Sequence, residues 1–538
     1  MPVQVPTEEN KKITGAATFK AETDNSVERN YMKNYMELKS GSDVRGYASD
    51  IFDNTVDLTE EAVYDIAAAF VPFLSEKAGK DATELTVSVG HDSRITAEKI
   101  KTQVIAALKA AGVKVYDCGL SSTPSMFMTT VHLGCDGAIQ ITASHHPADR
   151  NGLKFFLPTG GLDPQDISEI LTAANNGEKA EVAEGIVEKI DFMSQYSAIL
   201  RKLICDELGV AEEDKPLKDY HIVVDAGNGA GGFYADKVLA PLGADVSGSV
   251  YLEPDGMFPN HIPNPENAVA MAHITDAVLN ANADLGVIFD TDVDRAACVD
   301  PDGVEINRNR LVALAAAIAL EKEPGSTIVT DSVTSAGLKT FIEETLGGKH
   351  HRFKRGYKNV INEAVRLCNE GVNAPLAIET SGHAALKENY FLDDGAYLVT
   401  KIIIKMAKLG REGKNIFDLT ADLKTPAEEK EMRFNIMVDE FRSYGECVIE
   451  GLQRWCEAFK DKGFKIADDN HEGIRVSVLD GWFLLRLSVH DPVMPMNVES
   501  DSKDGCKKIV ELVADFFRNC QFLDCSAMEN FLEEKDDE

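Results

Sequence analysis

The chain has 538 residues, of which 44% are hydrophobic and 27% are charged, as in an ordinary soluble globular protein of about three or four domains. Lys and Arg number 55 against 89 for Asp and Glu, so the formal net charge is −34. Such a charge repels phosphate backbones and anionic lipid headgroups, which argues against nucleic-acid binding and membrane-surface binding as the main function.

Several features of the sequence bear on where the protein works. It contains no run of about 18 apolar residues, so we expect no transmembrane helix. The opening letters, MPVQVPTEENKK, lack the apolar stretch of a secretory signal. Ten cysteines are scattered without Cys-x-x-Cys spacing, which favours reduced thiols over a disulfide framework or a zinc site. The sequence therefore predicts a cytoplasmic protein.

An alternation of strand-like and helix-like patterns begins near residue 85. Leu85, Val87 and Val89 alternate as in a strand, residues 100–108 carry apolar side chains at helical spacing, and residues 113–116 are apolar again. A strand, a helix and a second strand in this order predict parallel pairing in an α/β fold, with helices covering the sheet. Similar apolar runs, each followed by a helical pattern, stand at 138–141, 222–224, 285–289, 328–329 and 376–378.

The last fifth of the chain has a different pattern. Apolar runs at 474–479 and 482–489 flank Asp480-Gly481, which predicts a hairpin with Asp and Gly as its left-handed turn residues. A segment with a continuous apolar side follows at 509–517, which predicts a helix.

Three candidate boundaries divide the chain. Polar, charge-rich stretches at 206–218 and 424–433 are predicted linkers, and a further boundary is expected at 305–310. The closing letters EEKDDE predict a solvated acidic tail. We therefore predict four domains, at 1–205 (with an N-terminal extension at 1–40), 206–308, 309–428 and 429–538.

Four polar segments carry candidate chemistry, and the first contains a serine between basic groups. Thr142-Ala143-Ser144-His145-His146-Pro147 follows a predicted strand, and Lys154 stands shortly after it. Ligand sites in α/β sheets lie beyond the carboxyl ends of strands, and a hydroxyl beside possible bases and a cation suits transfer of an acyl or phosphoryl group through serine. The same residues also fit a polar loop whose Ser and Thr cap a helix.

The second segment is acidic. Asp290, Asp292 and Asp294 alternate directly after the apolar run 285–289, and Arg295 follows. Carboxylates at this spacing project to one side of an extended chain and repel one another unless a cation lies among them. A hard divalent ion, most simply Mg²⁺, is the expected occupant. Calcium binding by another geometry and a solvated acidic loop are the alternatives, whereas an EF-hand is excluded because its Gly and Glu positions are Arg295 and Pro301.

The third and fourth segments are weaker signals. Glu379-Thr380-Ser381-Gly382-His383 offers donors and acceptors suited to a hydroxyl-rich ligand, or a loop histidine that is satisfied locally. Arg486 and Ser488 stand two apart in a predicted strand and can grip a phosphate together, although an edge-strand Arg without such a role is equally common. Further cations are Lys358 and Arg45.

A glycine-rich segment competes with this picture. Gly227-Asn228-Gly229-Ala230-Gly231-Gly232 follows a predicted strand and matches the dinucleotide-binding pattern, with Asp245 near the position of the ribose-binding acid. The alternative interpretation is a tight turn from strand to helix that needs small residues.

In this order, the four polar segments resemble the α-D-phosphohexomutase superfamily, most closely its bacterial-type phosphoglucomutase/phosphomannomutase members, over nearly the whole chain from about Ser42. The family fold is four domains around a central cleft, three related mixed α/β sheet domains and a C-terminal α+β domain. By this resemblance Ser144 carries a phosphoryl group in the active enzyme. The resemblance also implies one Mg²⁺ per chain, with ligand oxygens from phosphorylated Ser144, Asp290, Asp292 and Asp294.

The resemblance assigns the remaining residues by role. The catalytic group is completed by Lys154, His383, Arg295 and His145. The residues implied to hold the sugar or its non-reacting phosphate are Arg45, Lys358, Glu379, Ser381, Arg486, Ser488 and His490. The chain departs from the family pattern at His146 (usually Asn), at His490-Asp491-Pro492 (usually Thr-Glu-Pro) and at Pro495 (commonly Arg), which leaves the substrate preference open.

The implied reaction interconverts hexose 1-phosphate and hexose 6-phosphate, of glucose, mannose or both, through a hexose 1,6-bisphosphate that also serves as the activator. We expect small sugar phosphates as the partners and a monomer or homodimer. Alternatives within the family are a glucose 1,6-bisphosphate synthase and a phosphoglucosamine mutase, the latter usually with Gln or a related residue where Thr380 stands. Alternatives from other classes are an aspartyl-phosphate phosphatase with Asp290 as nucleophile and a dinucleotide-dependent oxidoreductase.

Overall fold

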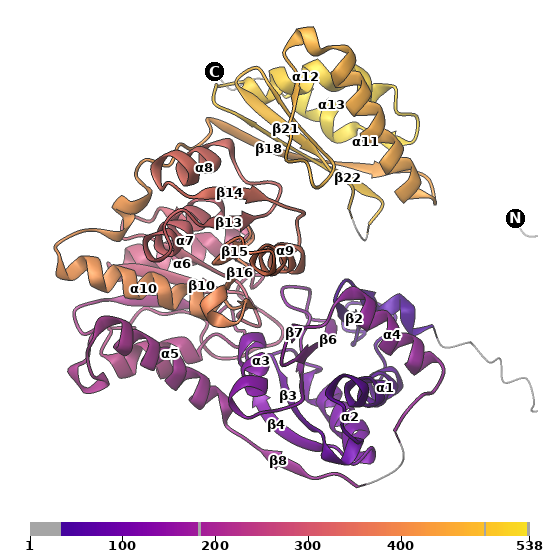
Figure 1. Ribbon diagram of the computed structural model, residues 1–538, viewed down its shortest axis with the longest axis vertical. Coiled ribbons are helices and arrows are strands. Elements are labelled where there is room, and N and C mark those ends of the chain that lie inside the picture. Colours follow the sequence, from indigo (N-terminus) through magenta and orange to yellow (C-terminus); the bar gives the residue numbers. More distant parts are fainter. Residues whose placement is uncertain (1–33, 181–183, 489–490, 535–538) are drawn as a thin grey trace, which may run out of the picture. The chain divides into compact units, whose positions relative to one another are not determined.

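The structure, a computed structural model, describes residues 34–180, 184–488 and 491–534 (Figure 1). The strands of these residues form four sheets, three of them mixed parallel and antiparallel and the last antiparallel. The predicted α/β fold with a C-terminal α+β part is confirmed. Within the described ranges, no helix is both long and apolar enough to cross a membrane.

The first sheet has the strand order β1-β2-β6-β5-β3-β4-β8, with β7 paired to β6. As predicted, β3 pairs in parallel with β4, and it also pairs in parallel with β5. Its strands are β1 (Lys39–Ser40), β2 (Asp43–Tyr47), β3 (Thr86–His91), β4 (Lys114–Leu120), β5 (Gly137–Ile141), β6 (Arg150–Leu157), β7 (Gly160–Gly161) and β8 (Val187–Lys189). The helices of this segment are α1 (Glu60–Ala78), α2 (Ala97–Ala110), α3 (Thr123–His132), α4 (Pro164–Asn175) and α5 (Phe192–Leu208).

The second sheet has the order β12-β11-β10-β9. Its strands are β9 (Ile222–Asp225), β10 (Leu285–Phe289), β11 (Ala296–Val299) and β12 (Glu305–Ile306), and its helix is α6 (Ala268–Ala281). β9 and β10 are parallel, so the glycine-rich segment after β9 and the acidic segment after β10 begin at the same edge of the sheet. Apolar side chains of α6, Ile274 among them, pack on Val223 and Ile288 of these strands.

The third sheet has the order β14-β13-β15-β16-β17. Its strands are β13 (Thr327–Thr330), β14 (Lys349–Arg352), β15 (Leu376–Ile378), β16 (Ala384–Leu386) and β17 (Leu392–Asp393), and its helices are α7 (Arg308–Lys322), α8 (Ala336–Thr340), α9 (Tyr357–Asn369) and α10 (Gly395–Arg411). A single hydrophobic core joins α5, the second sheet and the third sheet, and includes Tyr196, Phe289 and Ile402. Burial of this shared apolar surface fixes the acidic segment relative to the third sheet.

The fourth sheet has the order β19-β20-β21-β22-β18-β23. Its strands are β18 (Glu428–Ile436), β19 (Lys465–Ile466), β20 (Ile474–Val478), β21 (Gly481–Leu485), β22 (Val493–Ser500) and β23 (Leu523–Asp524). Its helices α11 (Phe441–Ala458), α12 (Gly505–Arg518) and α13 (Ser526–Glu533) lie against the sheet (Figure 1). They share one apolar core with the strands. The predicted linker 424–433 is wrong in its second half, because β18 begins at Glu428 and pairs with β22 along its length.

The predicted hairpin is present, but its turn differs from the prediction. Val478 pairs with Gly481, so the two turn residues are Leu479 and Asp480, and Leu479 has the positive φ of 52°. Gly481 already belongs to β21. A Cβ at Gly481 would lie 2.1 Å from the carbonyl oxygen of Glu499, so close approach to β22 rather than turn geometry requires glycine there.

Candidate active site

The serine segment leaves β5 and forms a tight, buried loop. Ser144 has φ 51°, a left-handed conformation that is uncommon for residues other than glycine. Its backbone N–H donates to Oγ1 of Thr142 at 2.8 Å, and only 4% of the residue is exposed. Backbone strain of this kind persists where the surroundings hold it, which is common at functional sites.

The guanidinium group of Arg94 provides that hold. Arg94 is buried, and its Nη1 donates to the carbonyl oxygens of Pro147 and Arg150 at 2.6 and 2.8 Å. Its Nη2 donates to the carbonyl oxygens of Ser144 and His146, the latter at 2.6 Å. One rigid side chain therefore binds four carbonyl groups of the serine loop, which fixes the direction of the Ser144 side chain.

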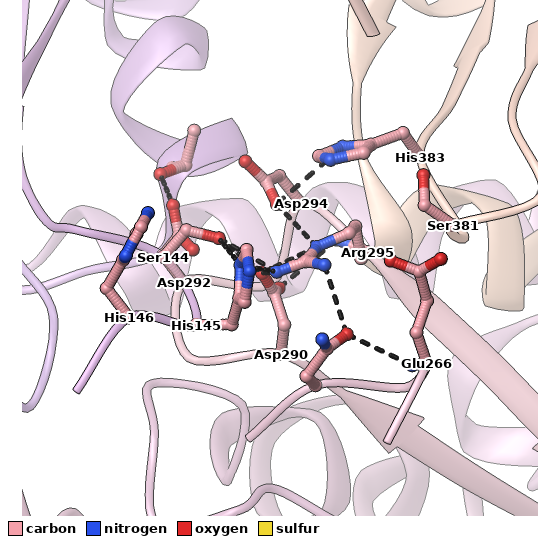
Figure 2. A network of polar contacts seen from close by, with 12 residues as sticks. Ser144, His145, His146, Glu266, Asp290, Asp292, Asp294, Arg295, Ser381 and His383 are labelled. Carbon is pink, nitrogen blue, oxygen red and sulfur yellow. Dashed lines mark hydrogen bonds and ion pairs between the residues drawn. The ribbon is translucent and has the colours of Figure 1, made fainter. Parts of the chain in front are cut away.

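The Ser144 hydroxyl lies against the acidic segment of the second sheet (Figure 2). Its Oγ donates to Oδ2 of Asp290 at 3.1 Å and accepts a hydrogen bond from Nη2 of Arg295 at 2.9 Å. Arg295 also donates from Nε and Nη2 to the same Asp290 oxygen, at 3.0 and 2.9 Å. A hydroxyl between a carboxylate and a guanidinium is placed both to lose a proton and to have negative charge stabilised beside it.

The two histidines after Ser144 are not cations in this environment. Burial, and next the charge of Arg295, hold the pKa of His145 far below its ordinary value. Burial, and next the charge of Arg45, lower the pKa of His146 to about 3. Nδ1 of His145 accepts from Nη2 of Arg295 at 2.7 Å, so its ring proton is on Nε2. His145 therefore faces Ser144 as a neutral, hydrogen-bonded ring.

The acidic segment brings three carboxylates together. Asp290, Asp292 and Asp294 are all buried, and each offers an oxygen within 4.8 Å of the others. The loop is strained, because the β-branched Val293 between two of them has φ 68°. One oxygen of Asp292 and one of Asp294 are buried without a hydrogen-bond partner. Such orphaned acceptors in a set of only oxygen ligands fit a hard divalent cation.

Lys154 and Arg295 balance part of this charge. Nζ of Lys154, from β6, lies 3.1 Å from Asp292 and 2.5 Å from Asp294. Although burial lowers it, the charges of Asp292 and Asp294 raise the pKa of Lys154 well above its ordinary value. Two cations stand against three carboxylates, and a phosphoryl group on Ser144 adds about 1.5 to 2 further negative charges at pH 7. The site therefore keeps a net negative charge, which a divalent metal ion would neutralise.

The segment after β15 approaches the acidic segment from the third sheet. Arg295 and His383 form an isolated antiparallel bridge. Nδ1 of His383 lies 2.5 Å from Oδ2 of Asp393 and 3.8 Å from Asp294, and its ring stacks on Tyr357 with centroids 5.1 Å apart. Burial lowers the pKa of His383, but the charges of Asp393 and then Asp294 outweigh it and raise the pKa to about 9.

Glu379 and Ser381 lie in the same segment. Glu379 accepts the backbone N–H of Gly356 at 2.5 Å and the Ser381 hydroxyl at 3.2 Å. Burial, and next the charge of Asp331, raise the pKa of Glu379 to about 7. The structure thus brings together Ser144, His145, Lys154, the three aspartates, Arg295 and His383, with Glu379 and Ser381 nearby.

The residues predicted to bind the non-reacting phosphate do not all lie in one cavity. Arg486 and Ser488 follow β21 and line a cavity of about 870 Å³ that His145 also lines. Arg45 is half-buried and pairs with Asp43 at 2.8 Å. Lys358 instead donates to the carbonyl oxygen of Gly161 at 2.6 Å and lines a separate cavity that Lys154 also lines. His490 lies outside the described residues.

Sequence reasoning missed Arg94 and Asp393, and it left the glycine-rich segment open. Arg94 follows β3 at the same sheet edge as the serine loop, and this position beyond a strand end could have indicated a site residue. Asp393 has no such local signal in the sequence. Gly229 packs under the acidic segment, where a Cβ would lie 2.6 Å from the carbonyl oxygen of Thr291. That contact supports the interpretation as a tight turn.

Comparisons with known proteins agree with this geometry. Residues 37–181, 196–303 and 307–425 match the phosphoglucomutase/phosphomannomutase α/β/α domains I, II and III. The phosphomannomutase/phosphoglucomutase of Pseudomonas aeruginosa is 31% identical over 471 residues, 87% of this chain and 92% of that protein. That of Pseudomonas putida is 30% identical over 434 residues, 80% of this chain and 86% of its own.

A solved structure extends the likeness to the fold. A phosphoglucomutase/phosphomannomutase family protein from Burkholderia thailandensis superposes with a TM-score of 0.71 at 26% identity, over 91% of this chain and 97% of that one. The chain therefore belongs to the α-D-phosphohexomutase superfamily, and within it to the bacterial-type phosphoglucomutase/phosphomannomutase family.

Proposed function

We propose that the protein is a hexose phosphate mutase that interconverts the 1-phosphate and 6-phosphate of glucose, mannose or both. The observation that carries this proposal is the placement of the Ser144 hydroxyl between Asp290 and Arg295, beside a triad of buried carboxylates. In the proposed reaction, phosphorylated Ser144 gives its phosphoryl group to the free hydroxyl of a hexose monophosphate. The resulting 1,6-bisphosphate reorients and returns its other phosphoryl group to Ser144, and the same bisphosphate serves as activator.

The proposed metal is Mg²⁺, held by Asp290, Asp292, Asp294 and an oxygen of phosphorylated Ser144. When bound, it would neutralise charge on the transferring group, the main electrostatic need of phosphoryl transfer. The guanidinium of Arg295 acts on the same group from the other side, because its Nη2 already binds Oγ of Ser144. The buried Arg94 keeps the serine in place throughout.

His383 is the proposed proton donor to the sugar. Its pKa of about 9 keeps the ring protonated at neutral pH. Since Asp393 holds the Nδ1 proton at 2.5 Å, the Nε2 proton is the one available to a sugar oxygen. Lys154 is proposed as a second group near the transferring phosphate. While it is paired with Asp292 and Asp294 it is a fixed cation that donates hydrogen bonds.

The remaining proposed roles concern substrate binding. Glu379 and Ser381 would hold sugar hydroxyls, and Arg45, Arg486, Ser488 and His490 the phosphate that does not react. The expected role of Lys358 at that phosphate is not supported, because Lys358 lines a different cavity from Arg486. The four domain boundaries, a cytoplasmic location and a monomeric or homodimeric state remain predictions. Both oxygens of Asp290 are engaged, which argues against Asp290 as the nucleophile of an aspartyl-phosphate phosphatase. Oδ2 accepts from the Ser144 hydroxyl and the Arg295 guanidinium, and Oδ1 accepts the backbone N–H of Arg295 at 3.2 Å.

One coupled assay tests the proposal and ranks the substrates. Glucose 1-phosphate, mannose 1-phosphate and glucosamine 1-phosphate are each supplied with and without a trace of the matching 1,6-bisphosphate, and formation of the 6-phosphate is followed. We expect turnover of the glucose or mannose compound, stimulated by bisphosphate. Net accumulation of bisphosphate would instead identify a synthase, and preference for the glucosamine compound would identify a phosphoglucosamine mutase.

A further inference from the structure

The cavity beside the serine loop has cations at two depths. It measures about 870 Å³ and is lined at one side by His145 and at another by Arg486 and Ser488. Arg308 and Arg433 stand at its exposed margin, with 54% and 70% of their side chains accessible, and each pairs with a neighbouring glutamate. Ion pairs this exposed contribute little, because water screens them.

Arg355 and Arg486 lie deeper in the same cavity. Their side chains are 25% and 12% accessible. Nη2 of Arg486 lies 4.0 Å from Oε2 of Glu431, and the Glu431 carboxylate also accepts hydrogen bonds from Arg433 and Asn497. Nε of Arg486 is buried without a hydrogen-bond partner. The guanidinium of Arg486 is therefore incompletely compensated and suited to an added anion.

Two carboxylates hold Arg355 in place beside this group. Arg355 belongs to the turn between β14 and α9, and its backbone N–H donates to Oε2 of Glu472, which precedes β20. Its Nη2 donates to Oε1 of Glu266 at 3.0 Å. The positive charge of Arg355 acts on Arg486, because burial and next Arg355 lower the pKa of Arg486. A guanidinium group that is disfavoured by a second guanidinium in the same cavity is a favourable place for an anion.

Lys358, three residues later, is oriented elsewhere. It donates to the carbonyl oxygen of Gly161 and lies 3.5 Å from Asp163, in a different cavity. The same turn thus presents Arg355, not Lys358, to the cavity that contains Arg486.

We propose that Arg355 is a substrate-binding residue that, together with Arg486, holds the non-reacting phosphate of the sugar phosphate, with Glu266 as its counter-ion when the site is empty. The inference rests on the proposed function. It adds Arg355, which follows β14 of the third sheet, to Arg486 and Ser488, which follow β21 of the fourth sheet. A phosphate dianion accepts parallel hydrogen bonds from guanidinium groups, which a single Arg486 supplies only in part.

The test compares Arg355→Met and Arg355→Lys with the wild type and with Arg366→Met. Arg366 lies on the adjacent helix α9, is 50% accessible, and pairs with the buried Glu363 and the exposed Glu370, so Arg366→Met is the matched control for loss of an arginine that pairs with glutamate. We expect Arg355→Met to raise the KM for glucose 1-phosphate about 10- to 100-fold with a smaller change in kcat, as for loss of one charge-assisted contact. The KM of Arg355→Lys should lie between those of the wild type and Arg355→Met, and the KM of Arg366→Met should match that of the wild type.

A binding measurement separates this inference from the proposed reaction. Calorimetric titration with inorganic phosphate should show weaker binding to Arg355→Met by a similar factor, whether or not the wild type is a mutase. Glu266→Gln removes the counter-ion but keeps Arg355, so it should bind phosphate at least as tightly as the wild type. An unchanged KM and phosphate affinity in Arg355→Met would overturn the proposal, and so would equal losses in Glu266→Gln and Arg355→Met, which would indicate a structural pair.

Discussion

Oγ of Ser144 donates to Oδ2 of Asp290 at 3.1 Å across 146 residues of sequence. The two groups come from the ends of β5 and β10, strands of different sheets. This contact unites the candidate nucleophile with the candidate metal ligands, and the account of the reaction depends on it.

Removal of the hydroxyl should abolish turnover without unfolding the protein. Ser144→Ala leaves the loop held by Arg94, which binds the carbonyl group rather than the side chain. We expect kcat to fall by about 10⁴-fold or more, as for loss of an essential nucleophile, with an unchanged thermal midpoint. Ser168→Ala on α4, whose hydroxyl only bonds Lys39 and its own helix, is the control and should retain full activity.

Arg94 should affect catalysis by holding Ser144 in position. Arg94→Met frees the serine loop and leaves Asp92 buried without its partner, so we expect about 3–5 kcal/mol of destabilisation and about 100-fold lower kcat. Adding Asp92→Asn removes the unpaired charge and should recover most of the stability but not the kcat. Recovery of both by the double variant, measured by denaturant unfolding and steady-state kinetics, would contradict a positioning role.

The Asp393–His383 pair predicts a specific pH dependence. The pKa of His383 is raised to about 9 from an ordinary value of about 6.5, so the stabilisation from this pair is complete below about 6.5 and is lost as pH rises through about 9. If protonated His383 donates to the sugar, kcat should fall over the same upper range. Asp393→Asn removes the larger of the two charges that raise the pKa, so the fall should move to lower pH. An alkaline limb that stays in place in Asp393→Asn would count against His383 as the donor.

Metal removal should stop catalysis and leave the fold intact. Lys154 and Arg295 keep two positive charges among the three aspartates without the ion, so EDTA should eliminate turnover with little change in the circular dichroism spectrum. Mg²⁺ should restore activity. Asp292→Asn should raise the Mg²⁺ concentration for half-maximal activity by at least about 10-fold, whereas Asp276→Asn on the exposed side of α6 should not. Full activity in EDTA would refute the metal assignment.

Local patterns predicted the parts of the site that each strand end supplies. The serine segment, the acidic triad and the His383 segment were visible because polar residues follow buried strands, and the corresponding strands β5, β10 and β15 are present. Arg94 and Asp393 were not predicted, because their roles arise from contacts with segments that only the tertiary fold brings near them. The turn at Leu479 was missed for a related reason, since the need for glycine at 481 comes from the neighbouring strand β22.

The net charge of −34 does not describe the local charge at the candidate site. It disfavours long polyanions, yet buried cations stand at Arg94, Lys154 and Arg295, and Arg45 is half-buried. A small sugar phosphate therefore meets locally positive groups in an acidic protein.

The proposed reaction requires a phosphoryl group on Ser144, and peptide mass spectrometry detects that group. The protein is incubated with glucose 1,6-bisphosphate, digested at acidic pH and mapped, with Ser144→Ala treated in parallel. We predict one phosphoryl group on the peptide that contains Ser144 and none in the variant. A phosphoryl group on Asp290, or an unmodified Ser144 in a protein that turns over substrate, would contradict the account.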